Sequence, residues 1–365
     1  MLQFPQKQIN MGIKKLVKSE DALLQVGKLC ASIGKRAFII GGPTALSITA
    51  EKIKCSMDEA GLIYHINEYR GFCSINRVQD FVGMAEHWQA DMIVAIGGGA
   101  IMDTGKAIGY YAHLPVITIP TIAATCAAWA PVSVLYDDEH LPAGGMDTYA
   151  PEYVICDYNV LMNAPKRYIA AGLGDSLAKW PELGTAKDPG PSYSAGVALA
   201  KHLSYQCLNL ADVFAFCDST AANDIQLGEN IVDNVIMVTG LSSELTSGAM
   251  VSSDYPLIAH GIDNALLRYS KNTHTFLHGE RVSFGLVPHM LICSAPMDRI
   301  SEVMQFLVKL KLPTRLEDFG IDESDIPGLS MMIFEAPGVG TTGVSVEQIE
   351  RALYQARSLP WADLY

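Results

Sequence analysis

The sequence predicts two domains, an α/β domain built on a parallel sheet and an all-α domain after it. Three observations carry this prediction. Up to about residue 160, short apolar runs alternate with helical patterns. From Lys166 onward, long helical periodicities follow with few β-branched runs, and the proline of Asn163-Ala164-Pro165 marks the change. We therefore place the domains at 1–162 and 163–365, and a chain of 365 residues is long enough for two cores.

The apolar runs of the first domain predict buried strands, and the segments between them predict helices. Apolar, β-branched runs such as RAFIIGG and DMIVAI are typical of strands. We expect strands at 36–42, 62–67, 91–96, 115–119 and 153–157, and helices at 44–60, 77–87 and 102–110. Such alternation is typical of a mostly parallel sheet with helices on both faces. In the second domain, helical spacing covers 168–183, 193–213, 224–245, 255–269, 278–293 and 302–310.

Composition excludes several classes of partner. The formal charge is −13 and no basic block offsets it, so we expect no nucleic-acid partner. No run of about 18 apolar residues predicts a membrane span, and the first residues lack the apolar core of a signal peptide. The 8 cysteines form no CxxC pair, which is typical of reduced thiols, so we expect a cytoplasmic location.

Three glycines, Gly97–Gly99, stand between a strand pattern and a helix pattern in IVAIGGGAIMDTGKAIG (93–109). Glycines at such a turn let an anion approach the backbone, and the N-terminus of the following helix favours a pyrophosphate. Asp103 and Lys106 lie on one face of that helix, where we expect contacts to ribose or phosphate. The alternative is a tight turn followed by a solvated ion pair, because GGG is not the GxGxxG fingerprint.

The pattern GGGxxxDxxK resembles the dinucleotide-binding motif of the metal-dependent (iron-containing) alcohol dehydrogenase family, in its glycerol dehydrogenase and hydroxycarboxylate dehydrogenase branch. The resemblance continues through Pro115–Tyr136 (PVITIPTIAATCAAWAPVSVLY), Tyr153–Pro165 (YVICDYNVLMNAP) and Gly172–Trp180 (GLGDSLAKW). It implies a dehydroquinate synthase-like two-domain fold, with a Rossmann-like NAD(P)-binding domain at 1–162 and a helical metal-binding and substrate domain at 163–365. The residues it places at the cofactor are Gly97, Gly98, Gly99, Ala100, Asp103, Lys106, Thr121, Ala124 and Tyr136.

The same resemblance implies a metal site formed by Asp175, His260 and His278. Taken singly, Asp175 is also a good helix N-cap and each histidine is also a packing or surface residue. Together they are similar, position for position, to the one-Asp, two-His zinc set of the glycerol dehydrogenase branch. Three protein ligands leave a fourth position open, as in catalytic zinc sites. Lys179 stands where the iron-using branch has a histidine, which favours zinc over iron.

We therefore expect an oxidoreductase that transfers a hydride between NAD(P)(H) and a small alcohol or carbonyl substrate, in a cleft between the two domains. A metal at the site would act as a Lewis acid on the substrate oxygen. His274, one turn before His278, is a candidate for proton transfer, with a plain loop histidine as the alternative. Relatives of this family are commonly homo-oligomers, so we expect the same here.

Two departures from the family pattern bear on specificity. Cys126 stands where glycerol-specific relatives place an Asp that bonds the polyol, and Trp129 adds bulk nearby. We therefore expect a 2-hydroxy acid or 2-oxo acid, with glycerol or a related diol as the alternative. The first strand ends Ile40-Gly41-Gly42 without the acid that bonds a ribose 2′-hydroxyl, which favours NADPH weakly, with Lys52 and Lys54 the nearest cations. Remoter alternatives are a sugar-phosphate cyclase-like lyase and a nucleotide sensor without its metal.

Overall fold

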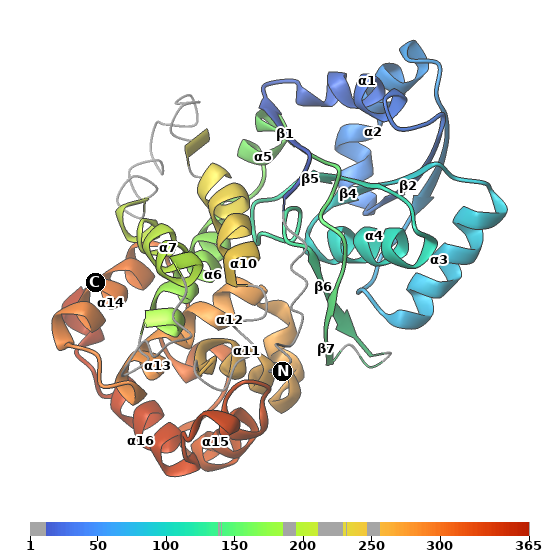
Figure 1. Ribbon diagram of the computed structural model, residues 1–365. Helices are drawn as coiled ribbons and strands as arrows, with labels where there is room; N and C mark the ends of the chain where they lie inside the picture. Colours follow the sequence, from blue (N-terminus) through green and yellow to red (C-terminus); the bar gives the residue numbers. More distant parts are fainter. Residues whose placement is uncertain are drawn as a thin grey trace, which may run out of the picture. The chain divides into compact units, whose positions relative to one another are not determined.

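The structure, a computed structural model, describes residues 12–137, 139, 141–184, 195–210, 229–230, 232–246 and 256–364 (Figure 1). The described chain divides into two compact units. Unit 1 holds the residues up to Pro165 together with 229–240, and unit 2 holds the residues from Lys166 to 210 and from Leu241 onward. None of the described helices is both long and apolar enough to cross a membrane.

Unit 1 is built on a six-stranded sheet in which every pair of neighbours is parallel. The strand order is β1-β8-β5-β4-β2-β3. The strands are β1 (Lys15–Ser19), β2 (Arg36–Gly41), β3 (Ile63–Glu68), β4 (Met92–Gly97), β5 (Val116–Pro120) and β8 (Tyr153–Asp157). Strands β2, β4, β5 and β8 are buried almost throughout, as their continuous apolar runs predict. The predicted α/β domain with a parallel sheet is confirmed.

Helices cover both faces of this sheet. Helices α1 (Val26–Ala31) and α2 (Pro43–Glu59) pack together on one face, and α3 (Ile75–His87) and α4 (Gly99–Ala112) pack together on the other (Figure 1). The chain therefore changes sides between β2 and β4. Their ends are joined by a bond from the Gly42 amide to the Ile96 carbonyl, 3.2 Å long. In open parallel sheets, ligands bind at such a topological switch point, outside the carboxyl ends of the strands.

Strands β6 (Val132–Tyr136) and β7 (Pro142–Asp147) form a two-stranded antiparallel hairpin, whose second strand was not expected from the sequence. β7 reads PAGGMD, which contains a proline and two glycines and lacks β-branched residues. Strand β1 and the short helices α1 and α5 (Tyr158–Met162) were also not predicted. The two helices have 6 and 5 residues, fewer than two helical turns, and β1 reads KLVKS with only two apolar residues.

Unit 2 is helical in its described part. Its α-helices are α6 (Lys166–Gly184), α7 (Ala195–Tyr205), α10 (Thr239–Thr246), α11 (Ile258–Tyr269), α12 (His278–Phe284), α13 (Leu286–Ile292), α14 (Met297–Lys309), α15 (Ile326–Glu335) and α16 (Val346–Arg357). α10 begins in unit 1. The patterns expected at 193–213 and 224–245 lie partly outside the described residues. The core includes Ile262, Leu266, Phe319 and Ile333.

The boundary between the two units lies after Pro165, and the later segment 229–240 belongs to unit 1. Three contacts of this returning segment account for the difference. Lys18 forms an ion pair with Asp233, and the Tyr158 hydroxyl lies 3.5 Å from the same carboxylate. Gly240 packs so closely on Trp129 that an added Cβ would lie 2.3 Å from its ring.

Candidate metal centre and dinucleotide pocket

Three side chains of unit 2 converge on one point. Asp175 lies on α6, His260 near the start of α11, and His278 is the first residue of α12. The Asp175 Oδ1 atom is 3.7 Å from His260 Nε2 and 3.5 Å from His278 Nε2. One ligand atom from each of the three residues lies within 4.8 Å of the others. The arrangement therefore offers one carboxylate oxygen and two imidazole nitrogens to a single ion.

The spacing of these atoms fits a metal ion. A tetrahedral centre with bonds of about 2.1 Å places its ligand atoms about 3.4 Å apart, whereas an octahedral centre places adjacent ones about 3.0 Å apart. The two measured separations, 3.5 and 3.7 Å, are nearer the tetrahedral value. A set of two nitrogens and one oxygen is also one that zinc accepts.

The His260 ring is held by Glu182, two helical turns after Asp175 on α6. Glu182 Oε2 accepts a hydrogen bond from His260 Nδ1 at 2.7 Å, and its Oε1 accepts one from the His260 amide at 3.1 Å. The carboxylate is fully buried. Because a carboxylate at Nδ1 keeps the hydrogen there, the Nε2 atom that faces Asp175 is left as a lone-pair donor.

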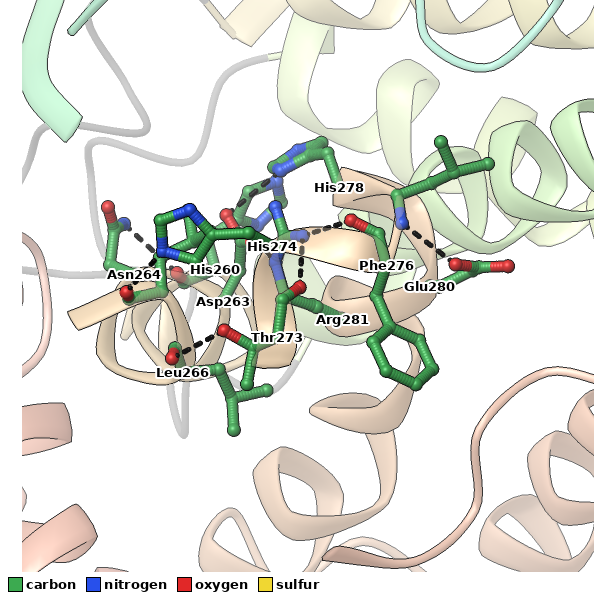
Figure 2. A network of polar contacts seen from close by, with 12 residues as sticks. His260, Asp263, Asn264, Leu266, Thr273, His274, Phe276, His278, Glu280 and Arg281 are labelled. Carbon is green, nitrogen blue, oxygen red and sulfur yellow. Dashed lines mark hydrogen bonds and ion pairs between the residues drawn. The ribbon is translucent and has the colours of Figure 1, made fainter. Parts of the chain in front are cut away.

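The His278 ring is held in the same way by Asp263 of α11 (Figure 2). Its Nδ1 lies 2.9 Å from Asp263 Oδ2, while Arg281 Nε donates to Asp263 Oδ1 at 2.6 Å. Arg281 also donates to the carbonyls of Thr273 and Phe276, so it ties the loop between α11 and α12 to the centre. Both candidate ligands thus belong to carboxylate–imidazole pairs, the arrangement typical of metal-binding histidines.

The charges of the centre favour a cation. Burial alone lowers the pKa of each imidazole, but Glu182 and Asp175 raise the pKa of His260 to about 9, and Asp263 and Asp175 raise that of His278 to about 10. Burial opposes ionisation of Asp175 too, yet the two facing imidazoles hold its pKa well below the usual range. With both imidazoles neutral, three buried carboxylates outnumber the cations Arg281 and Lys179. The remaining negative charge is what a metal ion would neutralise.

Close helix packing brings His278 to Asp175. A Cβ built on Gly279 would lie 1.9 Å from the Ala171 carbonyl oxygen of α6, and one built on Gly174 would lie 2.8 Å from the Ser283 Cβ. Only glycine allows α12 to approach α6 to this distance. The sequence His278-Gly279 therefore places a ligand and the contact that positions it side by side.

The structure also describes His274 and Lys179, the two other residues that the sequence placed near the metal. His274 is exposed in the turn Lys271–Thr275, and its Nε2 donates to the Leu267 carbonyl at 3.0 Å. It is not one of the three converging side chains. Lys179 is buried one turn after Asp175 and lowers the pKa of that carboxyl.

The glycine turn of unit 1 borders a pocket. Gly97 ends β4, Gly98 is the N-cap of α4, and Gly99 begins the helix. The pocket is lined by these glycines and by Met102, Pro120, Ile122, Ala124, Thr125, Ala127 and Ala128. Cβ atoms built on Gly98 and Gly99 would lie 2.8 Å from Ile122 Cδ1 and 3.3 Å from Thr125 Oγ1. Bare backbone at a helix N-terminus beside a pocket is suited to an anion such as a pyrophosphate.

Asp103 and Lys106 are both buried inside unit 1. Lys106 is 1% exposed, and its ammonium lies 3.0 Å from Asp103 Oδ1 and 2.8 Å from the Ala130 carbonyl oxygen. It also donates to the Val132 carbonyl. The alternative of a solvated ion pair is therefore wrong, because both residues are buried. A contact of Lys106 with the cofactor stays a prediction.

Of the remaining predicted residues of unit 1, Ala124 lines this pocket, whereas Ala100, Thr121, Tyr136 and Cys126 are not among its lining residues. Ala100 lies in the first turn of α4, and the Thr121 amide donates to the Gly97 carbonyl at 3.0 Å. Tyr136 lies in β6, with its ring centroid 5.1 Å from that of Phe72. Cys126 and Trp129 are buried in one turn, since the Trp129 amide donates to the Cys126 carbonyl at 2.9 Å.

Glu182, Asp263 and Arg281 were missed in the sequence. A signal was present for two of them, because Glu182 follows Asp175 by two helical turns and Asp263 follows His260 by one. Spacing of this kind places a carboxylate on the face of the helix that carries the ligand.

The chain is similar in sequence to a known family and to several of its characterised members. Residues 14–158 match the family described as iron-containing alcohol dehydrogenase. A glycerol dehydrogenase of Pseudomonas putida is 32% identical over 362 residues, covering 94% of this chain and 96% of the relative. The glycerol dehydrogenase of Thermotoga maritima is 33% identical over 321 residues, covering 84% of each. Hydroxycarboxylate dehydrogenase A of Escherichia coli is 30% identical over 301 residues, covering 79% of this chain and 78% of the relative.

Solved structures show the same fold. The glycerol dehydrogenase of Schizosaccharomyces pombe superimposes with a TM-score of 0.83 at 21% identity, covering 98% of this chain and 91% of that one. A probable glycerol dehydrogenase of Sinorhizobium meliloti gives a TM-score of 0.80 at 22% identity, covering 97% and 100%. With the parallel sheet, the helical unit and the relatives taken together, the chain belongs to the iron-containing alcohol dehydrogenase family, in its glycerol dehydrogenase branch, and is a dehydrogenase that acts on CH–OH groups.

Proposed function

We propose that the chain is a zinc-dependent dehydrogenase that transfers a hydride between NAD(P)(H) and a small diol such as glycerol. The observation that carries the proposal is the convergence of Asp175, His260 and His278, each imidazole backed by a carboxylate. Zinc held by these three ligands would leave a position for the substrate oxygen and supply Lewis-acid polarisation of it.

The residues of the chain supply position and charge. Glu182 and Asp263 keep a hydrogen on each Nδ1 atom, so that the Nε2 atoms stay available as ligands. The turn Gly97–Gly99 receives the cofactor pyrophosphate against the first amides of α4. Because the Nε2 atom of His274 donates to a carbonyl, its Nδ1 atom is an acceptor, which suits it to take the proton that the hydroxyl loses.

The substrate class rests on the relatives. Several that cover most of this chain are called glycerol dehydrogenases, which favours the diol over the 2-hydroxy acid expected from the sequence. The hydroxy acid remains a second candidate, because Cys126 puts no carboxylate in the substrate segment and hydroxycarboxylate dehydrogenase A is also a relative. An uncharged side chain there does not repel a carboxylate substrate.

We propose that the cofactor site accepts NADPH as well as NADH. β2 ends at Gly41 without an acid, which leaves room for a 2′-phosphate. Lys52 pairs with Asp21 at 2.6 Å, so of the two nearby lysines only Lys54 retains its place as a candidate phosphate contact. A homo-oligomeric state and a cytoplasmic location stay predictions.

A substrate panel tests the proposal. The zinc-loaded protein is assayed with glycerol, propane-1,2-diol and 2-hydroxybutyrate, and in reverse with 2-oxobutyrate, using each nicotinamide cofactor. We expect turnover of the diols with kcat/KM above that of the acids. Absence of turnover with every compound would contradict the proposal, and a clear preference for the acids would establish the second candidate.

Replacing Cys126 by Asp tests which residue sets that preference. We expect the ratio of diol to hydroxy acid kcat/KM to rise by about tenfold, since a carboxylate accepts from hydroxyls and repels an anion. Cys126→Asn is the matched control, because an asparagine side chain has nearly the shape of aspartate without its charge. If the two variants give the same ratio, Cys126 does not determine specificity.

A further inference from the structure

We infer that Lys106 is a positioning residue, which holds the wall of the dinucleotide pocket in place and makes no contact with the cofactor itself. The inference rests on the proposed function, in that it takes this pocket to be the cofactor site. It concerns a buried cation of the DxxK pattern that the hydride-transfer chemistry does not use.

The hydrogen-bonding capacity of Lys106 is fully used inside unit 1. An ammonium group has three N–H donors and no acceptor. Its three partners are the Ala130 carbonyl at 2.8 Å, the Val132 carbonyl and the Asp103 carboxylate at 3.0 Å. No donor is left for a phosphate oxygen. With a side chain that is fully buried, Lys106 also has no path to a ligand in solvent.

The partners of Lys106 belong to the chain segment that forms the far wall of the pocket. Ala127 and Ala128 line the pocket, and Ala130 and Val132 follow directly. The same segment is held at Ala128 by Thr118 of β5, whose hydroxyl donates to its carbonyl at 2.7 Å. A third tie returns to α4, where the Ser133 hydroxyl donates to the Asp103 carbonyl at 2.9 Å.

These ties connect the two sides of the pocket. α4 supplies the glycine turn and Met102 on one side, and the segment from Ile122 to Ala128 supplies the other. Lys106 joins them through buried, charge-assisted bonds, which are stronger and more directional than bonds between neutral groups. Lys106 is therefore one of the ties that set the distance between the phosphate-facing turn and the opposite wall. Loss of the ammonium should widen the range of pocket geometries and weaken cofactor binding.

The test compares a charge-balanced variant with a matched control. Asp103→Asn/Lys106→Met removes both charges together, which avoids leaving one buried and unpaired. The control is Asp80→Asn/Arg77→Met, an exposed pair on α3 with the same spacing in the chain. Two properties are measured in each protein: hydrogen exchange of the peptide covering 126–134 without cofactor, and the NADH dissociation constant at two salt concentrations.

We expect the double variant at Lys106 to exchange at least about tenfold faster at the Trp129 and Ala130 amides and to bind NADH about tenfold more weakly. The salt dependence of binding should match that of the wild type, because no phosphate contact has been lost. Thr118→Val should change both properties in the same direction by a smaller factor, since it removes another tie of the same wall.

Unchanged exchange together with a weaker salt dependence would overturn the inference, because it would show that Lys106 contacts a phosphate. Wild-type behaviour of the Lys106 variant in both measurements would overturn it as well. If the wild type itself binds no dinucleotide, the proposed function fails, while the exchange data still decide whether Lys106 holds the wall.

Discussion

At the scale of residues, the two imidazoles of the metal centre are held by carboxylates with different charge balance. Asp263 shares its charge with the buried Arg281, whereas Glu182 directs both oxygens to His260 and is itself fully buried. The Glu182 charge therefore acts undivided on His260, and burial makes that interaction strong. Both imidazoles are nevertheless strongly basic, with the pKa raised to about 9 at His260 and to about 10 at His278.

Removal of either imidazole tests the metal site. His260→Ala and His278→Ala should each lose bound zinc and lower kcat by at least about a thousandfold, because a two-ligand site neither retains nor orients the ion. Zinc content by atomic spectroscopy and steady-state turnover measure this. His202→Ala, an exposed histidine of α7, is the control. A variant at 260 or 278 that turns over at the wild-type rate without metal would falsify the site.

The carboxylates behind the imidazoles give a second prediction. Glu182→Gln should lower zinc affinity about tenfold, and Asp263→Asn by more, up to about a hundredfold. The difference arises because Asp263→Asn leaves the Arg281 cation unbalanced near the ion. Adding Arg281→Met to Asp263→Asn should therefore recover part of the loss. Chelator competition on the purified proteins measures affinity without reference to activity.

A half-buried carboxylate that faces no candidate ligand serves as the control for those variants. Asp325→Asn removes the charge from the partner of the Tyr269 hydroxyl at the C-terminal end of α11, and it should leave zinc affinity unchanged. Equal affinities for Asp263→Asn and the wild type would show that the second carboxylate has no influence on the metal.

The roles of individual residues were predictable only where those residues belong to a known sequence motif. Asp175, His260 and His278 were expected through their resemblance to a known ligand set, and the structure brings them together. Asp263 and Glu182 belong to no motif of known role, and the only signal for them is a spacing that places them on the ligand-bearing faces of α11 and α6. The burial of Lys106 was not predictable either, because its partners at Ala130 and Val132 depend on the unexpected path of the chain into β6.

At the scale of elements, the strand–turn–helix of β4 and α4 is the unit that forms the cofactor pocket. β4 is buried along its whole length, so its end is fixed, and the glycines after it leave the backbone open. A helix that begins at this point directs free amides toward the pocket. Such a unit depends on small residues at the turn as well as on the buried Lys106 that ties α4 to the opposite wall.

Gly99→Val tests that unit. An added Cβ would be 3.3 Å from Thr125 Oγ1 and 3.7 Å from Ala127 Cβ, so the protein should fold while the side chain occupies the pocket. We expect the cofactor KM to rise at least about tenfold and the melting temperature to stay within a few degrees. Gly83→Val, at an open position on α3, is the control for placing valine in a helix. An unchanged KM would mean that the glycine turn does not hold the cofactor.

Elements with long, regular patterns were predicted within a few residues. The strands expected at 91–96 and 153–157 are β4 and β8, and the helix expected at 44–60 is α2. The helix expected at 278–293 is two, α12 and α13, with Gly285 between them. A Cβ built on Gly285 would lie 2.7 Å from the Ala259 Cα, so the junction of the two helices packs closely on α11. Strand β7 was missed, since its sequence PAGGMD has weak strand propensity and its pairing with β6 depends on tertiary structure.

At the scale of the whole molecule, each unit has its own core. A core cluster of unit 1 lies on one face of the sheet and includes Leu23, Ile39, Met57 and Ile117, and a core cluster of unit 2 surrounds Phe319. The division into an α/β part and a helical part was predictable from the change of periodicity near 165. The return of 229–240 to unit 1 was not, because it depends on single contacts such as that of Asp233 with Lys18.

Metal removal should therefore act on one unit. All three candidate ligands and their carboxylates belong to unit 2, so bound zinc stabilises that unit by mass action, by about 2.7 kcal/mol at a hundredfold excess over its dissociation constant. For a domain of this size the melting temperature should fall by roughly 5–10 °C when zinc is removed. In hydrogen exchange, protection should be lost in α6, α11 and α12, while β4 and β5 exchange as before. Equal loss of protection in the strands of unit 1 would show that the ion is held elsewhere or that the two units unfold together.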